Sequence, residues 1–584
     1  MDKQTEEQSA PLIQTAAICT IRLNGQEMKH TVSSVQLDQY AHTHHVLKVR
    51  LLHVAQTASG RDISDPTPFA GFLGASVGLN IKPHGGMVDA SRELEFVGVV
   101  TQVDVDNSID GLNSVLITAH SPTIAMDGAQ RNAFYYEQSA SDIMGAIVQR
   151  YPITSGAMAS TSGVMKFCVQ YGETDYQFIR RLAGGNSLFA FYDGRKFAVA
   201  KAGSSTTDEL VWRETLGAFS VGLGTGSYQF EGQSFDYIQK KIVSASSGAS
   251  YPSVSGMLKK SPDASKQIYT NPGTSPLEPQ VPDTRTLESL LLARKGDVLG
   301  RMIVCTGTSI VPALSVGHCA KIKGMGSAFD GTYWVNKVHH TIDDSGKYHN
   351  TFEGTPLDLA HPYNSPSLPP ITHLQTGLVT DNDDPEGLGR VKVKLPWLPD
   401  NDTPFLRIAW PDAGNERGWF LMPEVDDEVL VGFEQGNPDS PVVIGCLYNG
   451  KDKPAVAGGS FLEGGKVKIK EFKTRNGNIV RFTDVDGDEQ VEILQKDGKN
   501  SITMKVSGPS IMIESKDGDI TIKGKNLTLD GDTIKLNTKQ DIGLKSGTDL
   551  KIEAGANLTQ KATANMEMQA SAQVTVKGGI VQIN

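Results

Sequence analysis

Cysteines are scarce in this sequence of 584 residues, and they lie far apart. The five are Cys19, Cys168, Cys305, Cys319 and Cys446, with no Cys-x-x-Cys pair among them. An odd number at such spacing argues against a disulfide framework or a zinc knuckle. We therefore expect buried, reduced thiols in a protein that is made in the cytoplasm.

Long apolar runs are missing as well. No stretch approaches the roughly 18 apolar residues that span a bilayer, and the start, Met-Asp-Lys-Gln-Thr-Glu-Glu-Gln, lacks the basic residues and apolar stretch of a secretory signal. The net charge of −11 argues against a nucleic acid as partner. We expect synthesis and assembly in the cytoplasm without a signal peptide, so that export or injection depends on another machine.

What is present indicates a globular, mainly β protein. The sequence has 60 glycines, 39% hydrophobic residues and only 7% aromatic ones, which favours many turns. The local patterns divide the chain into a β-rich part with short helices, a linker rich in Ser and Pro, a second β-rich part, a group of five short strands, a connector and a repetitive tail. The boundaries are 1–243, 244–284, 285–371, 372–450, 451–465 and 466–584.

Local signals place several elements. The capping box formed by Thr174 and Gln177 predicts a helix that starts at Asp175, and another helix follows Ser141. The run 333–338 predicts a strand, and residues 343–346 predict a hairpin turn after it. Five short strands in 372–450 are typical of a small closed OB-type barrel.

The tail repeats an apolar-x-apolar pair. Successive pairs start 7, 7, 8 and 8 residues apart, then 16 and 8, with Leu558 inside the longer gap. The residues that form the pairs are Ile520, Ile522, Leu527, Leu529, Ile534, Leu536, Ile542, Leu544, Leu550, Ile552, Met566, Met568, Val574 and Val576. Because side chains alternate between faces every two residues, an eight-residue step returns the same face inward.

Each repeat offers about two inward side chains, too few for one chain to enclose a core. Three chains wound around one axis solve this problem, and the listed pairs then form the core of an intertwined trimeric β-helix, or prism. With rungs about 4.8 Å apart, ten or so rungs from Ile502 give a stiff rod of roughly 50 Å. A monomeric β-solenoid is the alternative, but single-chain coils usually run to about twenty residues or more.

Three segments of the OB-type unit resemble the OB domain of VgrG spike proteins from type VI secretion systems. They are 377–393 (GLVTDNDDPEGLGRVKV), 421–433 (LMPEVDDEVLVGF) and 436–450. Upstream, 170–179 (QYGETDYQFI) is similar to the hub domain of that family, and 338–340 with 348–354 is similar to its second barrel. The family is itself similar to the baseplate hub and central spike of contractile phage tails.

This resemblance implies a homotrimeric structural spike with two hub barrels per chain. It implies a hexameric tube protein at the hub end, a PAAR-type tip protein at the C-terminal end, baseplate proteins, effector cargo and transient contact with a target membrane. Docking of the tip protein is expected on Val576, Ile580, Val581, Ile583 and Asn584. The sequence does not distinguish a cell-anchored secretion system from a free extracellular particle.

Signals for catalysis and for cofactors are weak. No Gly-x-Ser-x-Gly, His-Glu-x-x-His or phosphate-binding loop is present, and only about fifteen residues separate the OB-type unit from the tail. The His42, His44 and His45 cluster, His339-His340 and His318 are interpreted as structural, and the acidic run 484–489 as a hairpin turn. We expect no catalytic site, no metal and no cofactor; a secreted β-solenoid adhesin or glycan-binding OB protein is the alternative function.

Overall fold

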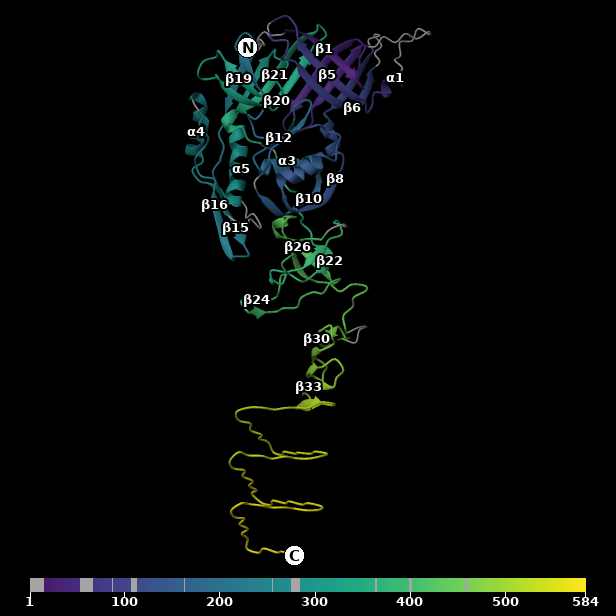
Figure 1. Cartoon of the computed structure of the whole chain (residues 1–584), viewed down its shortest axis with the longest axis vertical. Coiled ribbons are helices and arrows are strands. Elements are labelled where there is room, and N and C mark those ends of the chain that lie inside the picture. The colour runs from purple at the N-terminus through teal and green to yellow at the C-terminus, as the bar shows by residue number, and fades with distance from the viewer. Residues whose placement is uncertain are drawn as a thin grey trace, which may run out of the picture. The chain divides into compact units, whose positions relative to one another are not determined.

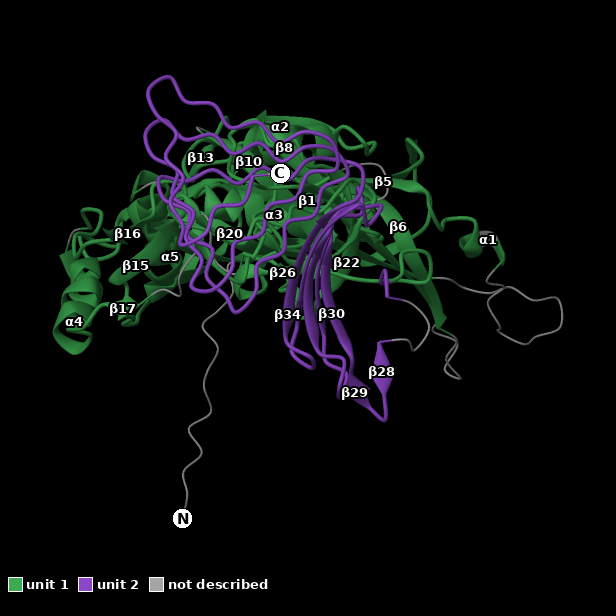
Figure 2. Ribbon diagram, turned by 90° about the horizontal axis from the view of Figure 1, so that it is seen from below, with its two compact units in different colours: residues 1–453 green, residues 454–584 purple. Residues whose placement is uncertain are grey.

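The computed structural model describes residues 15–52, 67–86, 88–106, 113–161, 163–254, 256–274, 284–362, 365–398, 402–456 and 461–583. It divides the chain into two compact units, Met1–Lys453 and Pro454–Asn584, which Figure 2 colours separately. Within the described ranges, no helix combines the length and the apolar character that a membrane crossing requires.

A first β-barrel is closed by strands from both ends of the hub. Its strands follow the order β20-β3-β4-β7-β6-β5-β1-β21, and the pairing of β20 with β21 closes the ring. The bounds are β1 (Thr15–Leu23), β3 (Val32–Tyr40), β4 (Val46–Leu52), β5 (Ser76–Pro83), β6 (Leu94–Asp106), β7 (Ser114–His120), β20 (Gly331–Ile342) and β21 (Lys347–Pro356). The short elements β2 (Gln26–Glu27) and α1 (Thr67–Ala70) lie between these strands in the sequence.

A second barrel uses the same two strands. Its order is β13-β19-β20-β21-β18-β14, and a bridge between Trp212 and Leu216 joins β13 to β14. The remaining bounds are β13 (Thr207–Val211), β14 (Leu216–Leu223), β18 (Ile303–Ser309) and β19 (Cys319–Lys323). The predicted division into one barrel in 1–243 and another in 285–371 is therefore corrected, because the hairpin β20–β21 belongs to both barrels; the turn predicted at 343–346 connects its two strands.

An α/β insertion between β7 and β13 carries the predicted helices (Figure 1). The Thr174–Gln177 capping box precedes α3 (Asp175–Gly185), as predicted. Helix α2 (Ala140–Val148) is capped by Ser139, two residues before the predicted Ser141, because the Ser139 hydroxyl accepts the Asp142 N–H. The other elements are η1 (Pro122–Asp127), β8 (Gln130–Ser139), β9 (Ser155–Met158), β10 (Val164–Thr174), β11 (Phe189–Tyr192) and β12 (Phe197–Ala200).

The segment predicted as a linker contains regular structure. Strands β15 (Phe230–Asp236) and β16 (Lys241–Ser246) form a hairpin, followed by η2 (Gly256–Lys259), α4 (Lys260–Ile268), β17 (Gly273–Thr274) and α5 (Thr284–Met302). Leu287, Leu291 and Leu299 recur at multiples of four and are buried, which explains a helix where the second β-rich part was expected to begin.

The OB-type barrel is present at the predicted place. Its sheet order is β23-β22-β26-β27, and bridges from Val391 to Leu406 and from Ile408 to Val443 close the circle through the predicted fifth strand. The bounds are β22 (Gln375–Asp381), β23 (Lys392–Lys394), β26 (Glu428–Phe433) and β27 (Pro441–Cys446). The elements η3 (Leu357–Leu359), β24 (Ala413–Gly414), β25 (Arg417–Gly418) and η4 (Glu434–Gly436) complete this unit.

The second unit begins with hairpins. After β28 (Leu462–Glu463) and β29 (Lys466–Val467), a five-stranded antiparallel sheet runs through β30 (Ile469–Lys473), β31 (Ile479–Thr483), β32 (Gln490–Leu494), β33 (Asn500–Lys505) and β34 (Ser510–Ser515). The acidic run 484–489 is the predicted turn between β31 and β32. Residues 466–515 thus form a meander instead of repeat rungs, and the later residues wind back and forth in successive layers, drawn yellow in Figure 1.

Candidate functional site: the apolar spike surface and the hub–OB junction

One face of the five-stranded meander is apolar. Phe472, Val480, Ile493, Ile502 and Ile513 lie directly opposite one another across all five strands. Phe482, Val491, Met504 and Ile511 form a neighbouring row on the same face. Seven of these nine side chains are exposed, from 37% for Ile502 to 73% for Ile511, and Val480 and Val491 are half-buried, so a large apolar surface has no cover within the described chain.

The other face of the meander carries charges. The Arg481 guanidinium lies 2.8 Å from a Glu471 carboxylate oxygen and 4.0 Å from a Glu492 carboxylate oxygen. The two faces therefore differ in polarity, as in a sheet that has one face in water and the other in a core.

The meander's apolar face continues into the start of the apolar repeat. A groove of about 490 Å³ in this unit is lined by residues that include Phe472, Ile493, Ile502 and Ile520. Ile520 is the first residue of the apolar repeat. The sheet and the start of the repeat thus line one groove, whereas the sequence predicts rungs of the rod only from residue 502 onward.

The repeat itself has no cover in a single chain. The fourteen predicted core residues are 51% to 67% exposed, with Val574 and Met568 at the two limits, and Leu558 is 58% exposed. Among the described residues 517–583, no backbone N–H is hydrogen-bonded to a backbone carbonyl. One chain therefore neither covers the apolar side chains of this segment nor supplies hydrogen-bond partners for its backbone.

The predicted tip-docking residues are similarly uncovered. Val576, Ile580, Val581 and Ile583 are 63%, 84%, 51% and 91% exposed. Asn584 lies outside the described residues.

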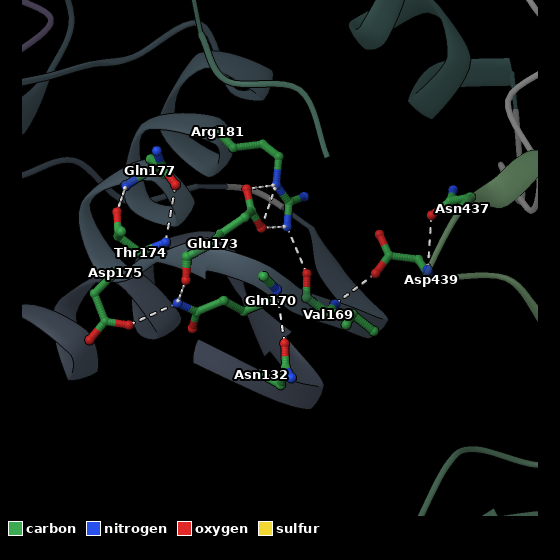
Figure 3. Close-up of polar contacts among 11 residues, drawn as sticks. Asn132, Val169, Gln170, Glu173, Thr174, Asp175, Gln177, Arg181, Asn437 and Asp439 are labelled. Atoms are coloured by element: carbon green, nitrogen blue, oxygen red, sulfur yellow. Dashed lines mark hydrogen bonds and ion pairs between the residues drawn. The ribbon is translucent and has the colours of Figure 1, made fainter. Parts of the chain in front are cut away.

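The hub insertion and the OB barrel meet at Val169 of β10 (Figure 3). The Val169 N–H donates to the Asp439 carboxylate at 2.6 Å, and its carbonyl accepts from Arg181 Nη2 at 2.7 Å. Asp439 precedes β27, so one residue of the hub is held simultaneously by the OB barrel and by α3. Asp439 is half-buried, and its removal from water raises its pKa to about 6.

Arg181 is itself fixed by a buried carboxylate. Its guanidinium donates to both oxygens of Glu173, with Nη2 at 2.9 Å from Oε2, and the Glu173 side chain is only 2% exposed. Gln170 donates to the Asp175 carboxylate at 2.9 Å and connects the strand to the start of the helix. The predicted family-like segment 170–179 thus supplies the polar framework behind the junction (Figure 3).

Apolar contacts join the same two parts. Phe134 and Val169 of the insertion belong to one buried cluster with OB residues such as Val393 and Val431. The centres of the Tyr171 and Trp397 rings lie 5.0 Å apart. A shared core resists relative movement of the two parts, since opening it would expose these side chains to water. Asp439 and Trp397 were not singled out from the sequence, because nothing local shows that a turn aspartate or a lone tryptophan packs on a distant strand.

The histidines lie in structural surroundings. The His44 ring nitrogens are 2.8 Å from the Thr123 hydroxyl and 3.0 Å from the Asp127 carboxylate. His45 and His340 are buried in the hub, and burial lowers the pKa of each to about 3. Across the part of the chain that the structure describes, no group of three His, Cys, Asp or Glu side chains is placed to hold a metal.

The cysteines follow the expectation only in part. All five are free; Cys168, Cys305 and Cys319 are buried, whereas Cys446 is exposed. Burial raises the pKa of the Cys168 and Cys305 thiols to about 12.

Comparison with known protein families agrees with this architecture. Residues 57–346 match the phage tail baseplate hub (GPD) family, and residues 375–448 match the type VI secretion system/phage-baseplate injector OB domain. The two matched families lie in the same order along the chain as the hub and the OB barrel of the structure.

Individual relatives point in the same direction. The chain is 25% identical to the type VI secretion system spike protein VgrG5 of Pseudomonas aeruginosa over 69% of this chain and 56% of that protein. It is also 25% identical to VgrG4b of the same organism, over 55% of this chain and 45% of that protein. The chain thus spans about half the length of these relatives. A Francisella VgrG, solved in a complex with PdpA, has the same fold, with a TM-score of 0.54, 10% identity and coverage of 86% of this chain and 81% of that one.

These matches define a structural hub-and-spike protein of the kind found in phage baseplates and contractile injection systems. Within that class, the chain is similar to the VgrG-type spike proteins of type VI secretion systems.

Proposed function

We propose that three copies of this chain form a spike that pierces a target membrane and performs no chemical step. The observation that carries the proposal is the uncovered repeat: the described residues 517–583 combine exposed apolar pairs with an unpaired backbone. Two further copies around the same axis supply both the missing apolar contacts and the missing hydrogen-bond partners.

The meander, which precedes the repeat in sequence, extends this trimer surface. Its apolar face joins the repeat through the groove at Ile520, and its charged face remains for solvent. Three such sheets with their apolar faces inward form the base of the prism, so the trimer core starts at Phe472 instead of Ile502. The VgrG family supports this reading, since spike proteins are its named members.

The hub–OB junction supports a mechanical function. Force applied to the hub reaches the OB barrel through the shared core and the Asp439–Val169–Arg181 contacts, with little relative movement. On this proposal, a hexameric tube protein and baseplate proteins bind the hub end and effectors are carried as cargo. The protein is assembled in the cytoplasm and leaves the cell when the machine fires.

The mass of the purified protein in solution tests the proposal. A trimer has about three times the chain mass of 62.8 kDa. A stable, folded monomer at micromolar concentration would overturn the trimer and, with it, the piercing role.

The C-terminal apolar residues are proposed to dock a PAAR-type tip protein. Ile580 and Ile583 are the most exposed of the set, at 84% and 91%. Deletion of residues 577–584 should abolish binding of the tip protein, measured by pull-down, while the trimer mass is retained. Retained binding would reject this docking site.

A further inference from the structure

The tip of the β15–β16 hairpin presents an uncovered apolar patch, here called the hairpin patch. Phe235 and Ile242 are paired across the two strands, and Ile238 lies in the turn between them. Their side chains are 46%, 65% and 53% exposed. Exposed apolar residues gathered at the end of a hairpin are typical of an interaction site.

This hairpin is fastened to the chain's own OB barrel. The Arg407 guanidinium lies 4.3 Å from the centre of the Tyr237 ring, and Arg390 Nη1 lies 3.4 Å from the Tyr237 hydroxyl. Arg390 is in turn held by Asp384 at 2.7 Å. The hairpin patch is therefore placed relative to the OB barrel by contacts that leave its apolar side chains uncovered.

A second patch, the loop patch, lies on the OB barrel itself. Trp419, Phe420 and Leu421 follow β25 in sequence, and they are 58%, 70% and 41% exposed. Both patches lie in the same unit and are uncovered, so the hairpin patch does not bury the loop patch of the same chain.

The charges around the two patches are complementary. Lys240 and Lys241 are exposed in the hairpin turn. The segment 411–428 around the loop patch contains six acidic residues and one basic residue, and that one, Arg417, is paired with Asp412 at 2.9 Å. A basic apolar tip and an acidic aromatic loop attract each other and discriminate against self-pairing of either patch.

A closed ring of identical subunits needs two different, complementary surfaces on every subunit, because each contact is head-to-tail. The proposed trimer brings three OB barrels into one assembly. We infer that the hairpin patch of one chain packs on the loop patch of the next chain and closes a ring at the level of the OB barrels. The inference rests on the proposed trimer and adds a contact outside the spike.

Cross-linking between separately mutated chains tests the inference. In a Cys446→Ser background, which removes the exposed thiol, one tagged chain carries Ile242→Cys and a differently tagged chain carries Phe420→Cys. The two full-length chains are co-expressed, purified through both tags and treated with a short bismaleimide. We expect a covalent species of about twice 62.8 kDa on a denaturing gel, and a lower yield when Lys240 and Lys241 are both changed to Glu.

A matched control places the first thiol on another exposed isoleucine. Ile268 of α4 is 60% exposed, against 65% for Ile242, and Ile268→Cys with Phe420→Cys should give no covalent pair. The mass of each sample before cross-linking distinguishes a failure of the ring contact from a failure of the trimer itself. A trimer without a cross-link between the two tagged chains overturns the inference and leaves the spike intact. A monomer overturns the proposed function itself.

Discussion

A single carboxylate in the repeat should prevent assembly of the spike. Leu536 is 64% exposed in one chain, and full burial of a leucine side chain contributes about 1.5–3 kcal/mol. Covering the exposed two-thirds contributes about 1–2 kcal/mol for each copy, and about 3–6 kcal/mol for the trimer, since the symmetry repeats each substitution three times.

Leu536→Asp removes this contribution and adds a larger penalty. Three carboxylates would face one another at the same level of an apolar core, where each loses its hydration and repels the others. We expect the trimer to dissociate at micromolar concentration, as measured by analytical ultracentrifugation or native mass spectrometry.

The adjacent residue provides the control. Lys535 lies between Ile534 and Leu536, and successive residues point to opposite faces, so Lys535 faces outward in the proposed prism. Lys535→Asp changes the charge by two units yet should leave the trimer intact. The reasoning would be refuted by equal trimer stability in the two variants, or by dissociation of both.

Two further predictions concern the hub. Arg181→Met leaves the buried Glu173 carboxylate unpaired and should destabilise the hub unit by about 3–5 kcal/mol, read as a lower midpoint in urea. Arg195 forms an exposed ion pair with Glu95, so Arg195→Met should lower the stability by less than about 1 kcal/mol; equal effects of the two substitutions would contradict the role of burial. The pKa values of His45 and His340, lowered to about 3 by burial, make the folded state bind fewer protons than the unfolded one. Their contribution to the free energy of unfolding is fully present above about pH 6.5. Below that pH, the free energy of unfolding should fall by about 1.4 kcal/mol per pH unit for each histidine. Urea midpoints between pH 7.5 and pH 4.5 measure this slope, and His45→Leu should reduce it.

The local patterns of the sequence predicted the elements that depend on neighbouring residues. The Thr174–Gln177 capping box and the turn at 484–489 are each specified within a few positions, and the OB-type barrel by the spacing of five short strands; the structure contains all three. Helix α5 lies where the second β-rich part was predicted to begin. Leu287, Leu291 and Leu299 carry a helical period, but the strand patterns in the residues that follow are stronger.

Contacts between distant residues were beyond the local patterns. No pattern at 331–356 indicates that the hairpin β20–β21 belongs to two barrels. The pairing of β20 with β3 joins residues some three hundred positions apart. The Asp439–Val169 bond is a similar case. The repeat period predicts an inward face for the tail, but the meander's apolar face emerges only when the register aligns Phe472 with Val480 and Ile493.

The hairpin β20–β21 has a consequence for biosynthesis. A chain that emerges from the ribosome displays β1 early, yet the ring containing β1 stays open until Pro356 has been added. Until then its neighbours in the ring leave strand edges exposed, and such edges invite aggregation. Truncated nascent chains that end before Gly331 should therefore require chaperones, whereas those that extend beyond the hairpin should become resistant to protease in one step.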